Sequence, residues 1–318
     1  MLRIAILGSG ALASYFAARL HEKAEVHMFG HWKARLNALK SEGLSLTERD
    51  GSKSQVQLRV SELNDFPHYF DVVLVLVKAW QTPEAAKEAS QLIAKKPSAF
   101  VLSLQNGIGN VPQLKSEVDQ SVFAGTTLQG AKINGLAGVA ASGTGSIFLP
   151  SSIDSGFIEI LRIAGFEVHL ADDLVSLLWS KLLINAAINP LTGAFGITNG
   201  TLLKSASLKA FLGDLALEVA ELAKAKSIDL LYTDPVAEVE RVALDTEENT
   251  SSMLADLRRG APTELEAITG FLLQEAGLQG LSLPQNKVVY QWMKEKLAGQ
   301  VPSDAVYQSI AQELANAG

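Results

Sequence analysis

One lysine and two asparagines recur at intervals of four in the apolar stretch WSKLLINAAINP, residues 179–190. Four residues advance a helix by about 400°, so Lys181, Asn185 and Asn189 would share one face of a helix that Pro190 ends or kinks. An ammonium group can stabilise charge on a carbonyl oxygen and protonate it, and amides can hold hydroxyl and carboxylate groups. The stretch therefore predicts a site that protonates a small polar substrate. The alternative is a solvent-facing stripe, although such stripes usually carry Glu, Lys and Arg.

A glycine-rich loop follows the first apolar stretch of the chain, in the sequence IAILGSGALA. The loop ends a strand pattern at 3–7 and opens an amphipathic stretch at 11–21, which is the setting of a dinucleotide-binding loop. There Gly8 would make the tight turn, and Gly10 would let the backbone approach a pyrophosphate at the helix N-terminus. Ala13 stands in place of the third glycine. A chance glycine turn is the alternative, but the βαβ pattern that follows favours a cofactor.

The residues after the second predicted strand, 25–29, indicate which dinucleotide binds. An NAD site has an acid there that accepts a hydrogen bond from the ribose 2′-hydroxyl. This chain has no acid at that place, and its candidate cations are His31, Lys33 and Arg35. The sequence therefore favours a 2′-phosphate and NADPH. Lys33 and Arg35 could equally form the solvated face of a helix.

Two further predicted strands end in polar residues at one edge of the sheet. Lys78 closes the strand at 72–77, and Asn106 follows the strand at 99–104. Ligands of parallel sheets gather at the carboxyl ends of the strands, so both residues are expected beside the cofactor. Taken separately, Lys78 could be a surface lysine and Asn106 could be the first residue of an Asn-Gly turn.

The elements that must position these residues change in kind near residue 171. Short strands alternate with helices before that point, which predicts an α/β fold with a Rossmann-type doubly wound sheet. Helical periodicity dominates after it, which predicts an all-helical domain. We therefore expect an NADP-binding domain at 1–171 and a helical substrate and catalytic domain at 172–318.

Composition excludes several other classes of protein. The 318 residues are 47% hydrophobic and 19% charged, as in an ordinary globular protein, and the net charge of -7 favours neither a nucleic-acid nor a membrane partner. The chain has no cysteine, and its five histidines show no helical pair at metal-binding spacing, so no metal is expected. Glycines interrupt the N-terminal apolar run too early for a secretory signal, and the apolar run at 72–77 is too short to span a bilayer. A cytoplasmic protein is predicted.

The motifs and their order along the chain are similar to those of the ketopantoate reductase (2-dehydropantoate 2-reductase) family. The helical domain of that family is similar to that of 6-phosphogluconate dehydrogenase. The matching segments span nearly the whole chain: GSGALA (8–13), VKAWQ (77–81), LQNGIG (104–109), WSKLLINAAINPLT (179–192), TNG (198–200) and SSMLADLRRGAPTELEAITG (251–270). The lysine helix and the last segment are quite specific, whereas the glycine loop alone is not.

The resemblance implies a role for each matching residue. Lys181 would be the general acid. The residues that would bind substrate are Asn106, Asn185, Asn189, Asn199 and Ser252. Those that would bind cofactor are Gly8, Ser9, Gly10, Ala11, Leu12, Ala13, Lys78, Asn106, Ala131 and Glu264. Two structural alternatives stay open: Thr250, Ser251 or Ser252 could simply cap a helix, and Glu264 could be a first-turn acid after Pro262.

The expected reaction is the NADPH-dependent reduction of 2-dehydropantoate to pantoate, in the pantothenate route to coenzyme A. One alternative is another small 2-oxo acid or a related β-hydroxy acid as substrate. Another is an NADP-binding sensor without catalysis, although a sensor need not keep a proton donor at position 181. The sequence leaves the oligomeric state open, with a homodimer as one option.

Overall fold

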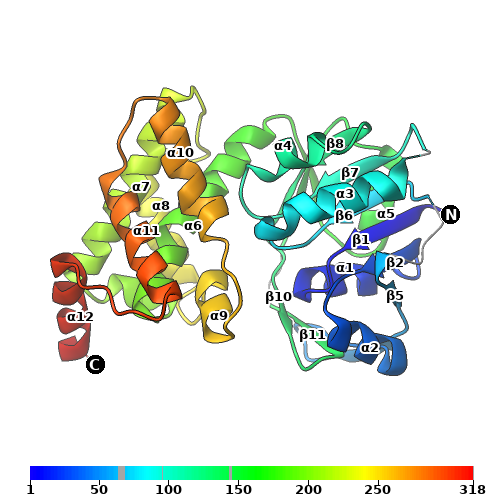
Figure 1. The fold of residues 1–318 in the computed structure, drawn as a ribbon, viewed down its shortest axis with the longest axis horizontal. Helices are drawn as coiled ribbons and strands as arrows, with labels where there is room; N and C mark the ends of the chain where they lie inside the picture. Colours follow the sequence, from blue (N-terminus) through cyan, green and yellow to red (C-terminus); the bar gives the residue numbers. More distant parts are fainter. Residues whose placement is uncertain (64–68, 95, 143–144, 318) are drawn as a thin grey trace. The chain divides into compact units, whose positions relative to one another are not determined.

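The computed structural model describes residues 1–63, 69–94, 96–142 and 145–317. The chain divides into two compact units. The first comprises Met1–Gln105 with Gly109–Leu174, and the second comprises Asn106–Ile108 with Val175–Gly318. Figure 1 shows the first unit in blue to green and the second mostly in green to red. The short segment 106–108 therefore belongs to the helical unit although it follows a strand of the first.

A parallel sheet forms the centre of the first unit (Figure 1). Its six strands within the described residues are β1 (Arg3–Leu7), β2 (Glu25–Phe29), β5 (Arg59–Ser61), β6 (Val72–Val75), β7 (Phe100–Ser103) and β8 (Ser121–Ala124). Their order is β5-β2-β1-β6-β7-β8, and each neighbouring pair is parallel. The chain runs outward from β1 in both directions, which is the doubly wound arrangement.

Helices cover both faces of this sheet, which explains why β6, with the sequence VVLV, is buried throughout. One apolar core joins one face to α1 (Ala11–Leu20), α2 (Lys33–Glu42) and α5 (Ser155–Ile163). A second core joins the other face to α3 (Thr82–Ile93) and α4 (Asn110–Lys115). The α/β class and the Rossmann-type sheet predicted from the sequence are confirmed.

Two smaller sheets complete the first unit. One has the order β10-β11-β3-β4, from Ala131–Ile133, Gly138–Ala141, Leu44–Thr47 and Lys53–Val56. The other has the order β13-β12-β9, from Val168–Ala171, Ile147–Pro150 and Thr126–Thr127. The turn between β10 and β11 matters for the site below, because its carbonyl groups bind a buried arginine.

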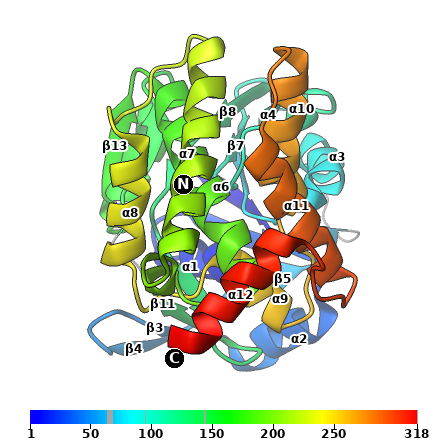
Figure 2. The ribbon, with the colours of Figure 1, turned by 90° about the vertical axis from the view of Figure 1, so that its left-hand side faces the viewer.

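The second unit is helical, as predicted. Its elements are α6 (Leu174–Phe195), η3 (Asn199–Leu203), α7 (Ala206–Ala225), α8 (Pro235–Asp245), α9 (Ser252–Arg258), the π-helix η4 (Glu266–Gly270), α10 (Phe271–Leu278), α11 (Pro284–Leu297) and α12 (Ala305–Ala317). Side chains cap the starts of α7, α8, α9 and α12, since Ser205, Asp234, Ser251 and Asp304 each accept a hydrogen bond from the backbone N–H three residues on. Figure 2 shows α12 running obliquely to α7, and its Tyr307 stacks on Phe195 with ring centroids 4.6 Å apart.

Helix α6 is the core helix of this unit. Among the described residues it is the one helix long and apolar enough to cross a membrane, but 61% of its apolar window is buried inside the protein, as in the core helix of a soluble protein. The expected end of the helix at Pro190 is wrong, because α6 continues to Phe195. Leu191 and Ala194 beyond the proline are fully buried, and this packing offsets the lost backbone hydrogen bond.

Candidate functional site

The polar line predicted from the sequence, which consists of Lys181, Asn185 and Asn189, lies on α6. Lys181 and Asn185 are half-buried, and Asn189 is 7% exposed. Leu182, Leu183 and other apolar neighbours of these residues on α6 are buried. The burial of Asn189 excludes a fully solvated stripe. One ammonium group and two amides on a single helix offer both donors and acceptors, so this line is suited to bind a polar ligand.

Lys181 is the cation of this line, and its surroundings change its acidity. Burial lowers the pKa of its ammonium group to about 8, and the carboxylate of Glu264 opposes part of that shift. A lysine with such a pKa can release its proton near neutral pH, which an ordinary surface lysine does rarely. Lys181 therefore has the property that a proton donor needs.

Three predicted residues from distant segments of the chain meet in the second unit. Asn106 donates a hydrogen bond from Nδ2 to Oε2 of Glu264 at 3.2 Å, and Glu264 is the residue whose charge acts on Lys181. Gly107 allows this approach, since it has a φ of +84° and an added Cβ would lie 2.8 Å from the carbonyl oxygen of Ala267 in η4. Glu264 is only 5% exposed, so it is more than a solvated first-turn acid.

Asn199 and Ser252 occupy different environments in the helical unit. Asn199 is 8% exposed and donates from Nδ2 to Oγ1 of Thr246 at 2.9 Å, while its buried Oδ1 has no hydrogen-bond partner among the described residues. Ser252 is exposed in the first turn of α9.

Of the three candidate caps of α9, Ser251 is the one that accepts the capping bond, from the backbone N–H of Leu254. It also accepts from Thr192 Oγ1 of α6 at 2.7 Å, so it ties the start of α9 to the lysine helix. The hydroxyl of Ser252 is therefore not used for capping.

The glycine loop of the first unit has the shape that a dinucleotide requires. Gly8 has a φ of +124°, and an added Cβ would lie 3.0 Å from the carbonyl oxygen of Leu76, so a larger residue would clash. An added Cβ at Gly10 would instead meet nothing within 4 Å. The N-cap residue of α1 is Gly10, which has no side chain to cap the helix, and the first backbone N–H groups of such a helix can bind an anion. Ala13 is fully buried in the apolar core of the first unit.

The three candidate cations after β2 differ in their exposure and in their partners. His31 Nε2 lies 2.8 Å from Oε1 of Glu88 on α3, and Lys33 Nζ lies 3.8 Å from Oε1 of Glu62 after β5. Both cations remain largely exposed at their side chains, at 53% and 75%. The sequence argument that no acid lies in this region is therefore incomplete, because the fold brings acids from α3 and β5 to it.

Arg35 is the third candidate, and it is fully buried. The sequence left open which of the three cations would hold a 2′-phosphate, and the burial of Arg35 argues against this residue, because its guanidinium group binds oxygens inside the protein. A signal for this was present in the sequence: Arg35 is three and four residues before Ala38 and Leu39, which are buried on the same face of α2.

Lys78 and Ala131 lie in the first unit, and both are half-buried. Lys78 follows β6 and precedes the short helix η2 (Ala79–Gln81). Sequence reasoning missed the nearby Gln105, a buried amide that donates to Val77 O at 3.1 Å and to Thr82 Oγ1 at 2.9 Å. Gln105 thus joins the carboxyl ends of β6 and β7, from which Lys78 and Asn106 follow.

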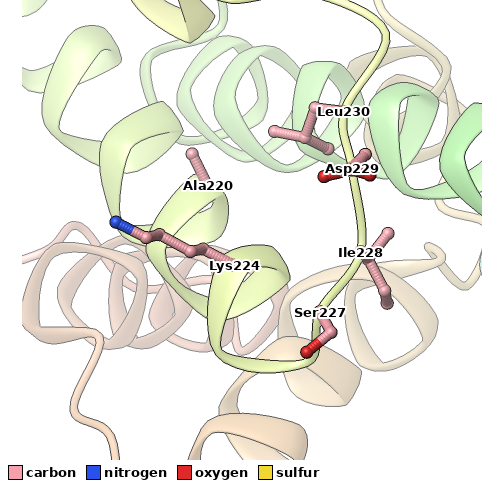
Figure 3. Close-up of a pocket in the computed structure, with 6 residues that line it drawn as sticks. All are labelled: Ala220, Lys224, Ser227, Ile228, Asp229 and Leu230. Carbon is pink, nitrogen blue, oxygen red and sulfur yellow. The ribbon is translucent and has the colours of Figure 1, made fainter.

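Two cavities, one in each unit, are lined by residues other than the predicted site residues. One of about 230 Å³ lies at the end of α7, where Figure 3 shows the Lys224 side chain extending away from Asp229. Another of about 500 Å³ in the first unit is lined by residues such as Tyr15, Arg19 and Glu48. No group of three or more metal-binding side chains occurs within the described residues.

Most of the chain matches the models of one protein family. Residues 4–152 match the family model of ketopantoate reductase PanE/ApbA, and residues 173–297 match that of its C-terminal domain. A 2-dehydropantoate 2-reductase from Archaeoglobus fulgidus is 30% identical over 294 residues, which cover 90% of this chain and 95% of that protein.

Two solved structures have the same fold. A PanE/ApbA family ketopantoate reductase from Ralstonia eutropha JMP134 is similar with a TM-score of 0.88 and 27% identity, over 94% of this chain and 99% of that one. A D-mandelate dehydrogenase in complex with NADH and anilino(oxo)acetate has a TM-score of 0.87 and 23% identity, over 94% and 99% of the two chains. At that identity the second likeness concerns the fold alone.

Proposed function

The chain belongs to the ketopantoate reductase family, an oxidoreductase family that acts on a small molecule with a nicotinamide cofactor, and from this premise we propose its reaction. The protein reduces 2-dehydropantoate to pantoate with NADPH, and Lys181 is the general acid. The observation that carries this proposal is the polar line on α6, in which a lysine with a pKa of about 8 precedes Asn185 and Asn189.

Lys181 supplies the proton in this reaction. The reduced nicotinamide, when bound, supplies the hydride that the C2 carbonyl carbon accepts. As the hydride adds to the carbon, the π bond of the C2 carbonyl breaks and negative charge develops on its oxygen. The ammonium group stabilises that charge and transfers its proton to the oxygen. The product is the C2 hydroxyl of pantoate, and Lys181 is left neutral until it takes a proton from water. Its lowered pKa makes this transfer more favourable than from an ordinary lysine.

The asparagines bind and orient the substrate in this proposal. A small 2-oxo acid with a hydroxyl group offers both donors and acceptors, and an uncharged amide can pair with either. Asn185 and Asn189 are on the lysine's own helix, so they can fix the substrate relative to the proton donor. Asn106, Asn199 and Ser252 complete the proposed set, and the unpaired Oδ1 of Asn199 is consistent with a further hydrogen bond to be made.

NADPH is the proposed cofactor, and the fit of the glycine loop supports it. The open space at Gly10 and the uncapped start of α1 suit the pyrophosphate. The remaining proposed contacts come from Ser9, Ala11, Leu12, Lys78, Ala131 and Glu264. His31 and Lys33 are exposed enough to turn toward a 2′-phosphate, whereas Arg35 is not.

The proposed setting is cytoplasmic, in the pantothenate route to coenzyme A, and the enzyme would act as a homodimer. Nothing in the net charge of -7 favours nucleic acid as a partner. Sedimentation of the purified protein tests the dimer independently of the reaction.

A panel of 2-oxo acids tests the function. The absorbance of reduced nicotinamide is followed with the protein, NADPH and each acid in turn, and we expect the highest kcat/KM for 2-dehydropantoate. A higher value for another 2-oxo acid would change the substrate. Tight binding of NADPH without turnover of any acid would favour the sensor and contradict the proposal.

A further inference from the structure

Arg35 carries a positive charge that no carboxylate balances within the described part of the chain. Its side chain is 0% exposed, and burial lowers the pKa of its guanidinium group to about 10, so it is still charged at neutral pH. A buried charge without a counter-charge is strongly unfavourable unless other groups stabilise it. The structure must therefore contain such groups, or a ligand must supply the missing negative charge.

All the donors of Arg35 are occupied by neutral oxygen atoms. A guanidinium group has five N–H donors. Its partners are Ser9 O at 2.6 Å, Ser14 Oγ at 2.9 Å, Leu136 O at 2.8 Å, Gly135 O at 3.3 Å and Gly138 O at 3.4 Å. These oxygens belong to the glycine loop, to α1, and to the β10–β11 turn together with the first residue of β11. Arg35 thus joins three elements of the first unit, but none of its partners cancels its charge.

The bond to Ser9 O sets the direction of one backbone amide. In a planar trans peptide the C=O and N–H groups point in opposite directions, and no cis peptide occurs in the described chain. Because the carbonyl of Ser9 points at Arg35, the N–H of Gly10 points away from it. The space at Gly10 is open, since an added Cβ would meet nothing within 4 Å. This amide is therefore presented to the place where a pyrophosphate binds such a loop.

We propose that Arg35 is a positioning residue of the cofactor site: it orients the Gly10 amide toward the pyrophosphate, and the pyrophosphate balances its buried charge. This inference rests on the proposed function only for the class of cofactor. It gives Arg35 a role toward the part that NADPH and NADH share, and none toward the 2′-phosphate that distinguishes them.

Nucleotide binding separates a role of Arg35 toward the pyrophosphate from a role toward the 2′-phosphate. The affinities of Arg35→Lys and Arg35→Gln for NADPH, NADH and 2′-AMP are measured by fluorescence titration without any oxo acid. We expect both dinucleotides to bind at least about tenfold more weakly, and by similar factors. The reason is that neither lysine nor glutamine reproduces the planar guanidinium group with its five N–H donors. The affinity for 2′-AMP, which has no pyrophosphate, should change by less than about twofold.

Two results would overturn the proposal. One is a loss for NADPH and 2′-AMP with NADH unchanged, which would make Arg35 a ligand of the 2′-phosphate. The other is wild-type affinity for both dinucleotides in both variants. If the wild-type protein binds NADPH but reduces no 2-oxo acid, the proposed function fails while this comparison can still be made.

The wild-type protein provides a second measurement in case the variants do not fold. The amide resonance of Gly10 is followed by NMR while ADP-ribose or 2′-AMP is added. We expect a large shift with ADP-ribose, whose pyrophosphate reaches the loop, and a small one with 2′-AMP. A Gly10 resonance that does not respond to ADP-ribose would contradict the proposal.

Discussion

Each unit of the molecule contains one notable cation, and the two are built differently. Arg35 in the first unit is fully buried, and neutral oxygens occupy all its donors. Lys181 in the second unit is half-buried, and the carboxylate of Glu264 acts on it. Burial lowers the pKa of both, to about 10 for Arg35 and about 8 for Lys181.

The difference separates a residue suited to hold structure from one suited to transfer a proton. Arg35 remains charged at neutral pH, and its fixed fork can orient backbone groups but cannot supply a proton to a ligand. Lys181 has a pKa within reach of neutral pH and a flexible side chain, so it can lose and regain its proton. The charge of a buried cation alone therefore does not indicate its role; its donors and its acidity do.

The largest effect is expected from removing the ammonium group. Lys181→Ala should lower kcat by a factor of about 10² to 10⁴, which is typical of a lost general acid. The affinity for NADPH and the circular dichroism spectrum should remain as in the wild type. Turnover close to the wild-type rate would refute the acid role.

Lys181→Arg sharpens the same test, because it keeps the positive charge and removes the mobile proton. An arginine does not deprotonate near neutral pH, so kcat should stay at least about tenfold below the wild type. Recovery of full activity in this variant would mean that position 181 acts through charge alone.

Cofactor preference tests the view that the first unit's exposed cations, rather than Arg35, meet the 2′-phosphate. We expect kcat/KM to be at least about tenfold higher with NADPH than with NADH, which corresponds to about 1.4 kcal/mol. Equal values for the two cofactors would remove the argument from His31 and Lys33.

A carboxylate on α3 should limit that preference. Glu88 pairs with His31, so Glu88→Gln would release the imidazole and remove a charge that repels phosphate. The preference for NADPH should rise by about threefold, whereas Glu84→Gln, an exposed acid one turn earlier, should change it less. A lower preference in Glu88→Gln would show that the pair holds His31 in position for the phosphate.

Local patterns predicted most of the fold. The strand at 3–7 and the helix that follows Gly10 are where the sequence indicates, because apolar periodicity and glycine act over a few residues. Pro190 is the exception, since tertiary packing outweighs a local preference against helix. The polar line of Lys181, Asn185 and Asn189 was also predictable, because it depends on helical spacing alone.

Contacts between distant residues could not be predicted in this way. Asn106 and Glu264 are 158 positions apart, and neither residue type indicates the other. The pairing of His31 with Glu88 depends on how α3 packs against the sheet. In the sequence, Arg35 cannot be distinguished from the other two candidate cations. Its burial and its hydrogen bond to Ser9 O show that it binds the glycine loop.

The smallest effect concerns the acidity of Lys181. With a pKa of about 8, the ammonium form is lost as pH rises through that value, so kcat/KM for reduction should fall above about pH 8. The charge of Glu264 raises this pKa, and Glu264→Gln should therefore move the alkaline limb to lower pH. Glu266→Gln, which removes an exposed acid two residues on, is the matched control and should leave the limb in place. A limb that stayed fixed in Glu264→Gln would mean that this carboxylate does not set the acidity of the proton donor, and the contrast with the uncompensated Arg35 would rest on burial alone.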